Sequence, residues 1–193
     1  SLRTFSTIDK KCDIIKLYNE EEVRFLVQHK KINMPGFEII NDKEYLAVKK
    51  LFKKDGGVLF AHGFDKMRKK YHVREFEENF KKKINCDHAL AVSSGTAAIK
   101  IALKTLGVKK GDEVITQAFN FIATVEAILD IGAKPVIINV NKTLNMDPKK
   151  IESVITKKTK VILPVHMLGV PAEMDPIIKI AKKYRIKVLE DNC

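Results

Sequence analysis

A glycine flanked by hydroxyl side chains forms the first segment with recognisable chemistry. Ser93-Ser94-Gly95-Thr96-Ala97-Ala98 separates an apolar run from a helical pattern. Gly95 lets a ligand approach the backbone closely, and the unpaired N–H groups of a first helical turn favour an anion. The segment could therefore hold a phosphate group. A simpler alternative is that Ser94 or Thr96 only caps the helix.

Two later segments contribute an aromatic ring and a carboxylate. Phe121, between a strand and a helix, could stack on a planar heterocycle, although Phe119, Phe121 or both could instead pack in the core. Asp191 ends the apolar run that starts at Val188, and a carboxylate there can keep a pyridine nitrogen protonated. The same carboxylate could instead cap a following helix or pair with a surface lysine. A phosphate cradle, a ring face and a ring-nitrogen partner occur in chain order, which predicts a pyridoxal 5'-phosphate (PLP) site.

His166 is a further candidate because it also follows an apolar run. Its side chain could hydrogen-bond Asp191 or contact the cofactor, although a single histidine is more often structural. The sequence has neither a GxGxxG motif nor a Gly-Lys-Ser/Thr phosphate loop, which disfavours an ordinary nucleotide-binding domain. Its three cysteines are far apart and show no metal-ligand spacing, so we expect reduced thiols and no metal site.

A regular alternation of strands and helices should position these residues. The expected strands are 89–92, 113–116, 135–140, 161–166 and 187–190, and the expected helices are 44–52, 73–84, 96–106, 122–131, 148–155 and 176–184. Asp147 and Asp175, each followed by proline, are the expected N-caps of the last two helices. Apolar strands between amphipathic helices predict an α/β protein with three α/β/α layers and a mostly parallel sheet. Ligands of such sheets bind at the carboxyl ends of the strands, which is where the candidate residues fall.

The charge of +12 does not by itself indicate a nucleic-acid partner. The excess comes from 36 Lys and Arg against 24 Asp and Glu, scattered in short groups, without Trp. Such groups usually form a solvated surface, so nonspecific affinity for polyanions is expected before specific nucleic-acid binding. The apolar runs have strand length, so no membrane span is expected. The first residues show no signal-peptide pattern, and we expect a cytoplasmic protein.

Together these segments resemble the DegT/DnrJ/StrS family of sugar aminotransferases, which have the type I (aspartate-aminotransferase) PLP fold. The matching segments follow one another in the family's order: Met34-Pro35-Gly36, Val73 to Glu77, Ser94 to Ala98, Gly111 to Ile115, Phe121 to Thr124, Gly132 to Val136, Asn145 to Pro148, Val165 to Gly169, and Glu190-Asp191. Some positions depart from the family pattern. Asn120 stands where threonine is usual, Asn139 and Asn141 replace acids, and Asn192-Cys193 replaces two alanines. These departures suggest a particular subgroup.

The resemblance implies roles for the candidate residues and an activity for the whole enzyme. Gly95 and Thr96, beside Ser94, would hold the PLP phosphate, Phe121 would stack on the ring, and Asp191 would pair with the ring nitrogen. The enzyme would be a homodimer with shared active sites, moving an amino group from an amino acid, usually glutamate, to a nucleotide-linked keto-sugar. Some relatives carry histidine in place of the Schiff-base lysine and act as PLP-dependent sugar dehydratases, which remains an alternative. A noncatalytic regulator or a nucleic-acid binder on the same fold is the less favoured class.

The resemblance also divides the chain. Residues 1–32 are an extension of unknown role, residues 33–87 an N-terminal helical segment, and residues 88–193 part of the PLP-binding large domain. We expect the Schiff-base lysine, the rest of that domain and a small C-terminal domain in a segment that these residues do not contain. The 193 residues alone should then be inactive and should self-associate through exposed strand edges and apolar surface.

Overall fold

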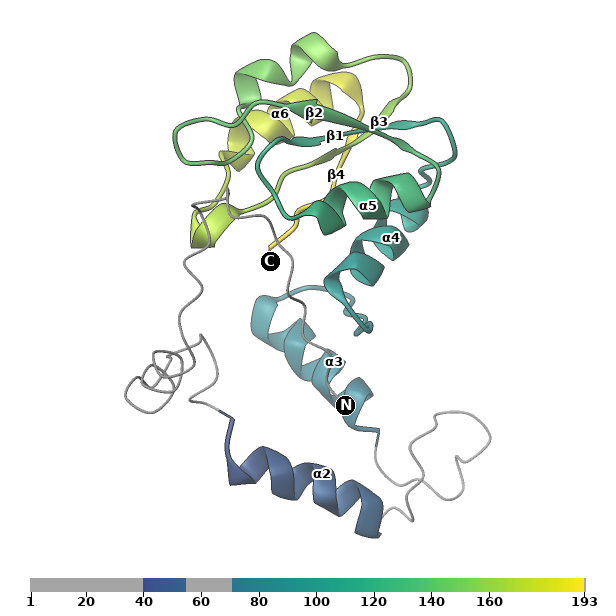
Figure 1. The fold of residues 1–193 in the computed structure, drawn as a ribbon, viewed down its shortest axis with the longest axis vertical. Coiled ribbons are helices and arrows are strands. Elements are labelled where there is room, and N and C mark those ends of the chain that lie inside the picture. The colour runs from purple at the N-terminus through teal and green to yellow at the C-terminus, as the bar shows by residue number, and fades with distance from the viewer. Residues whose placement is uncertain (1–39, 55–70, 193) are drawn as a thin grey trace, which may run out of the picture. The chain divides into compact units, whose positions relative to one another are not determined.

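The structure, a computed structural model, describes residues 40–54 and 71–192 (Figure 1). The expected extension 1–32 lies outside the described residues. The chain divides into two compact units, residues 1–72 and 73–193. In the first unit, helix α2 (Asp42–Lys54) confirms the helix predicted at 44–52. Asn41 Oδ1 accepts the Lys43 amide at 3.0 Å and the Asn41 amide donates to Glu44 at 2.7 Å, which forms a capping box.

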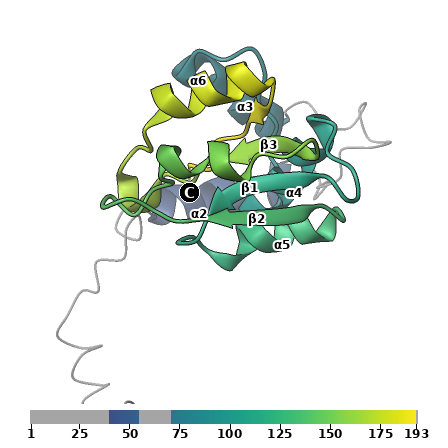
Figure 2. The same cartoon turned by 90° about the horizontal axis from the view of Figure 1, so that it is seen from above.

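The second unit contains the predicted parallel sheet. Strands β1 (Glu113–Gln117), β2 (Lys134–Ile138), β3 (Thr159–Leu163) and β4 (Lys187–Val188) lie in the order β2-β1-β3-β4, and every described pairing between them is parallel (Figure 2). An isolated parallel bridge between Val165 and Asp191 continues the β3–β4 pairing beyond Pro164, which has no N–H to donate. The carboxyl ends of the strands therefore share one edge.

Helices cover both faces of this sheet. Helices α4 (Gly95–Thr105) and α5 (Ile122–Asp130) lie on one face, and α6 (Met174–Tyr184) with the 3-10 turns η2 (Pro148–Lys150) and η3 (Glu152–Val154) lies on the other (Figures 1 and 2). Val114 of β1 packs in the α4/α5 core and its neighbour Ile115 in the α6 core. Because side chains alternate along a strand and both faces are covered, the middle of each central strand is apolar towards both faces, at Val114-Ile115 in β1 and at Val161 to Leu163 in β3.

Helix α3 (His72–Ile84) confirms the prediction at 73–84 and has an exposed apolar face. Phe76 and Phe80 stack with ring centroids 5.8 Å apart, and neither ring is buried. Glu77 accepts the amide of Ala91 at 2.8 Å, which links this helix to the segment before α4. No helix in the described ranges 40–54 and 71–192 has the length and apolarity needed to cross a membrane.

Three local predictions were wrong. Residues 89–92 form no strand, because a strand needs a hydrogen-bonded neighbour and edge strand β4 does not pair with them. Residues 148–155 form η2 and η3 in place of one helix. Bonds of the i→i+3 type, from Ile151 to Pro148 and from Val154 to Ile151, close these short turns, and Ile155 is extended. Finally, α6 begins at Met174 after Glu173, so Asp175 lies within the first turn and is not the N-cap.

Candidate active site

The amino end of α4 is capped by a side chain. Ser94 is the N-cap, and its Oγ accepts the Ala97 amide at 3.2 Å. The capping role considered for Ser94 is therefore real. It leaves the amides of Gly95 and Thr96 without an acceptor among the described residues. Two free N–H groups at the positive end of a helix suit a phosphate group, so capping and anion binding are compatible here.

Phe121 presents its ring at the start of α5. It is the residue before the helix, and 77% of its surface is exposed, against 47% for Phe119. Neither ring packs in the core that residues 40–54 and 71–192 form, so the core-packing alternative is not seen for either ring there. The turn before it is held by Asn120, whose side-chain amide donates to the carbonyl of Gln117 at 3.0 Å. An exposed ring on a braced turn is available for stacking on a planar ligand.

Asp191 reaches the same helix from the end of the sheet. Its carboxylate is buried, and Oδ2 accepts the hydroxyl of Thr124 at 3.2 Å. Its backbone is fixed by bonds of 3.0 Å, from its amide to Pro164 and from the His166 amide to its carbonyl. Thr124 lies one turn after Phe121, so the ring and the carboxylate belong to the same corner of the site.

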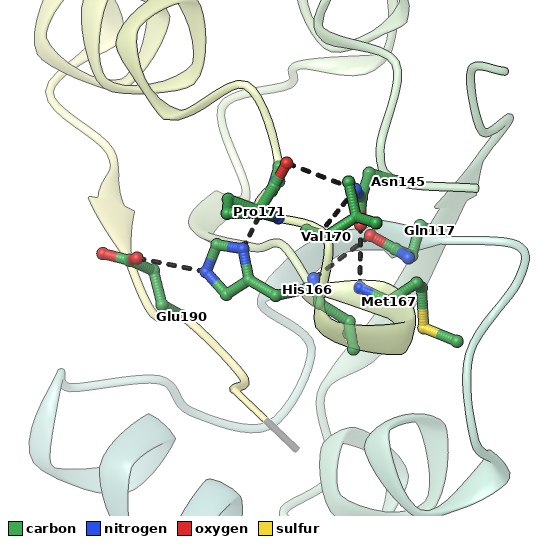
Figure 3. Close-up of polar contacts among 9 residues, drawn as sticks. Gln117, Asn145, His166, Met167, Val170, Pro171 and Glu190 are labelled. Atoms are coloured by element: carbon green, nitrogen blue, oxygen red, sulfur yellow. Dashed lines mark hydrogen bonds and ion pairs between the residues drawn. The ribbon is translucent and has the colours of Figure 1, made fainter. Parts of the chain in front are cut away.

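The imidazole of His166 lies on the opposite face of the sheet from that corner. Val165 and Leu189 pack with the α4/α5 core, so their successors His166 and Glu190 point to the α6 face. The amide of Ala172 donates to His166 Nδ1 at 2.9 Å, which places the imidazole proton on Nε2. Nε2 then donates to Glu190 Oε2 at 3.2 Å (Figure 3). The structure thus gathers Phe121 and Asp191 but directs the His166 side chain to Glu190.

Two buried amides that were not singled out from the sequence organise this edge (Figure 3). Gln117 Oε1 accepts the amides of Met146 and Val165, both at 3.1 Å. Its Nε2 donates to the carbonyls of Phe119 at 2.9 Å and Leu144 at 3.2 Å. One side chain therefore joins the loops that follow β1, β2 and β3. A polar residue at the end of the buried run 113–117 is the signal that could have revealed it.

Asn145 extends this network to the loop after β3. Its Oδ1 accepts the amide of Met167 at 2.9 Å, and its Nδ2 donates to the carbonyls of Val170 at 3.0 Å and Pro171 at 3.3 Å. The side chain is fully buried. In the sequence, Asn145 stands out only as part of a segment that matches the family. Its position in one loop does not show which other loop its side-chain amide will contact.

A parallel sheet covered by helices on both faces, with an exposed ring and a buried carboxylate beyond the carboxyl ends of its strands, is the arrangement of type I PLP-dependent enzymes. Residues 61–193 match the DegT/DnrJ/EryC1/StrS aminotransferase family. The chain belongs to this family.

Individual relatives agree with that assignment. The spore coat polysaccharide biosynthesis protein SpsC of Bacillus subtilis (strain 168) is 42% identical over 120 residues, which are 62% of this chain and 31% of SpsC. GDP-perosamine synthase of Caulobacter vibrioides is 40% identical over 120 residues, which are 62% of this chain and 32% of that protein. The chain therefore spans about a third of the length of these curated relatives.

Solved structures show the same fold. The structure of NtdA from Bacillus subtilis with bound cofactor PMP matches with a TM-score of 0.71 and 37% identity, covering 80% of this chain and 34% of NtdA. GDP-4-keto-6-deoxy-D-mannose-3-dehydratase of E. coli with bound hydrated PLP matches with a TM-score of 0.67 and 30% identity, covering 80% and 39%. The cofactor of this family is PLP or its amino form. The open α4 amides, the exposed Phe121 ring and the buried Asp191 carboxylate fit such a group.

Proposed function

We propose that the protein is a PLP-dependent aminotransferase that moves an amino group from an amino acid, glutamate in the first instance, to a nucleotide-linked keto-sugar. The observation that carries the proposal is the corner formed by α5 and the end of β4. There the exposed ring of Phe121 and the buried carboxylate of Asp191 are held one helical turn apart through Thr124. The named relatives that act on GDP-linked sugars support the substrate class.

Each candidate site residue has a physical task in this proposal. The amides of Gly95 and Thr96 and the Thr96 hydroxyl bind the phosphate, and Ser94 keeps the helix end in place. Phe121 covers one face of the pyridine ring. Asp191 holds a proton on the ring nitrogen, because a nearby negative charge favours the protonated form. When bound, PLP supplies an electron sink for the bond broken at the amino-bearing carbon.

The rest of the proposal concerns the complete protein. We infer a homodimer, with a Schiff-base lysine and part of each active site supplied from outside the 193 residues. His166 contributes indirectly, because its backbone amide holds Asp191 while its side chain holds Glu190. A cytoplasmic location is consistent with a substrate that is a nucleotide sugar.

The absorbance spectrum of the complete gene product with PLP tests the proposal. We expect a visible band on PLP binding that disappears when glutamate is added, with the pyridoxamine form of the cofactor appearing in its place. A bound cofactor that does not respond to glutamate or other amino acids would favour the dehydratase alternative, which the likeness to the E. coli enzyme supports. A protein that binds no PLP would refute the site.

The variant Asp191→Asn tests the role of the carboxylate, and the natural protein is its control. It keeps the size of the side chain and an oxygen that can accept the Thr124 hydroxyl, but it removes the charge. We expect the variant to fold and to lose the response to glutamate, because the ring nitrogen is no longer held protonated.

A further inference from the structure

A hollow lies at the amino ends of the strands, away from Asp191. Its volume is about 650 Å³, and it is formed where β3 and β4 begin and where α4 and α6 end. The lining residues are Leu106, Ile155, Thr156, Lys157, Thr159, Lys160, Tyr184, Arg185, Ile186 and Lys187. This basic hollow plays no part in the proposed amino transfer.

The rim of the basic hollow is positively charged. Lys157, Lys160, Arg185 and Lys187 are all exposed, and no Asp or Glu is among the lining residues. Within the described parts of the chain, none of these four cations forms an ion pair. The neighbouring residue Lys183 differs from these four cations, because it forms an ion pair. Lys183 contacts Glu152 at 2.8 Å. The cations of the rim thus remain available for an anion from solution.

The backbone holds two of these cations on short, braced turns. Arg185 follows α6 in the left-handed region (φ 56°), where glycine is the residue that adopts the conformation without strain. The Arg185 side chain is exposed and lines the basic hollow. On the other side, Thr156 donates to Glu113 at 2.6 Å and accepts the Lys158 amide at 3.0 Å, which fixes the turn carrying Lys157.

The lining of the hollow also has an apolar part. The half-buried side chains of Leu106, Ile155 and Ile186 form this apolar wall, and the exposed ring of Tyr184 is a further lining residue. A planar guanidinium group binds phosphate oxygens in pairs, and lysines add point charges around them. A cationic rim above an apolar wall is the arrangement that suits a phosphate chain attached to a less polar body.

We propose that the basic hollow is a second ligand site, which binds the phosphate chain of a small molecule such as a nucleoside triphosphate or free polyphosphate. Arg185 and Lys160 contact the phosphates, and Lys157 and Lys187 complete the rim. The site is independent of the proposed aminotransferase activity, because none of its residues is used there.

Calorimetric titration of the complete, PLP-saturated gene product with inorganic triphosphate and with ATP tests this site. Saturation with PLP keeps the phosphate cradle at α4 occupied. The test variant is Arg185→Gly with Lys160→Gln, and the control is Lys142→Gln with Lys149→Gln, which removes the same charge outside the basic hollow. Glycine relieves the left-handed strain at position 185, so the test variant should fold at least as stably as the natural protein.

We expect the natural protein to bind triphosphate at about 0.15 M salt. The test variant should weaken binding by about tenfold or more, and the control by less than about twofold. Tighter binding of ATP than of triphosphate would assign the apolar wall to a nucleoside, and equal binding would assign the site to polyphosphate alone. The proposal is wrong if the natural protein binds neither ligand, or if the test and control variants lose the same affinity. The experiment measures ligand binding and not amino transfer. Its result therefore tests the second ligand site separately from the proposed function.

Discussion

Thr124 connects the helix that presents Phe121 to the strand end that presents Asp191. Its hydroxyl donates to Asp191 Oδ2 at 3.2 Å, and both side chains are buried. A buried carboxylate oxygen needs a hydrogen-bond donor, and the Thr124 hydroxyl provides one, so Thr124 fixes the orientation of the Asp191 side chain.

Replacing Thr124 with valine should therefore weaken cofactor binding while keeping the packing volume. The variant loses a charge-assisted hydrogen bond, which contributes about 1.5 kcal/mol or about tenfold in affinity. A PLP titration followed by absorbance measures the change. Thr105→Val is the control, because the Thr105 hydroxyl bonds only its own helix, at the Ile101 carbonyl. Equal affinities of the Thr124 variant and the natural protein would show that Thr124 does not support Asp191.

Gln117 is the residue whose loss should most disturb the carboxyl edge. In Gln117→Leu the buried amides of Met146 and Val165 lose their acceptor. Each unsatisfied buried group costs about 1–3 kcal/mol, so the free energy of unfolding should fall by about 3 kcal/mol. Urea unfolding of the complete gene product measures it. Asn139→Ala removes an exposed amide nearby and should change stability by less than about 0.5 kcal/mol. A similarly small change for Gln117→Leu would contradict the bracing role.

The sequence predicts the positions of Phe121 and Asp191 near the carboxyl ends of the strands, but it does not predict the direction of the His166 side chain. Strand periodicity puts all three at the same edge of the sheet, because each follows an apolar run. The bridge between Val165 and Asp191 continues the alternation past Pro164, so the His166 side chain takes the face opposite to Val165. The imidazole consequently bonds Glu190, a partner that residue type alone does not specify.

At the scale of elements, α4 and its cap join stability to ligand binding. Ser94 closes the amino end of α4, while Ile99 and Leu103 anchor the helix in the α4/α5 core. Lys100 forms an ion pair with Asp130 at the end of α5. The helix end that should receive a phosphate is thus held by its cap on one side and by the neighbouring helix on the other.

Ser94→Ala should lower the stability of the protein by about 1 kcal/mol, which is the usual cost of losing an N-cap side chain. Because the amides of Gly95 and Thr96 fray with the first turn, PLP affinity should fall as well. Ser93→Ala, one residue outside the cap, should leave both unchanged. A stability loss without any loss of PLP affinity would mean that the cradle lies elsewhere.

The elements that the sequence predicts well are those whose own hydrogen bonds or central position settle their structure. Helices α3 to α6 and strands β1 to β3 occur within a few residues of their predicted bounds. The segment 89–92 is apolar enough for a strand but has no paired neighbour, and Glu77 takes the Ala91 amide. Residues 148–155 close as two 3-10 turns with i→i+3 bonds, whereas the nine residues of α5 form an α-helix. The first failure concerns a pairing partner and the second the type of helical hydrogen bond, and a local pattern encodes neither.

At the scale of the whole molecule, the second unit exposes apolar surface beside an unprotected sheet edge. Among the strands that the structure describes, β4 has a neighbour on one side only, which is β3. Next to it, Leu90, Val92, Ile101, Leu106 and Leu189 are among the residues that line an apolar hollow of about 360 Å³. Leu90 is 70% exposed and Ile101 43%. An open strand edge beside such a surface is a template for association with another chain.

We therefore expect the 193 residues, expressed by themselves, to self-associate at micromolar concentration despite a charge of +12. Size-exclusion chromatography with light scattering measures the mass. Leu90→Lys combined with Ile101→Lys should raise the monomer fraction, because two charges in the apolar hollow oppose its burial. Lys substitutions of Leu144 and Leu168, which are exposed outside that hollow, serve as the control and should have little effect. A monodisperse monomer that unfolds cooperatively would show that the apolar surface beside β4 is satisfied within the chain, and the expectation of self-association would then be wrong.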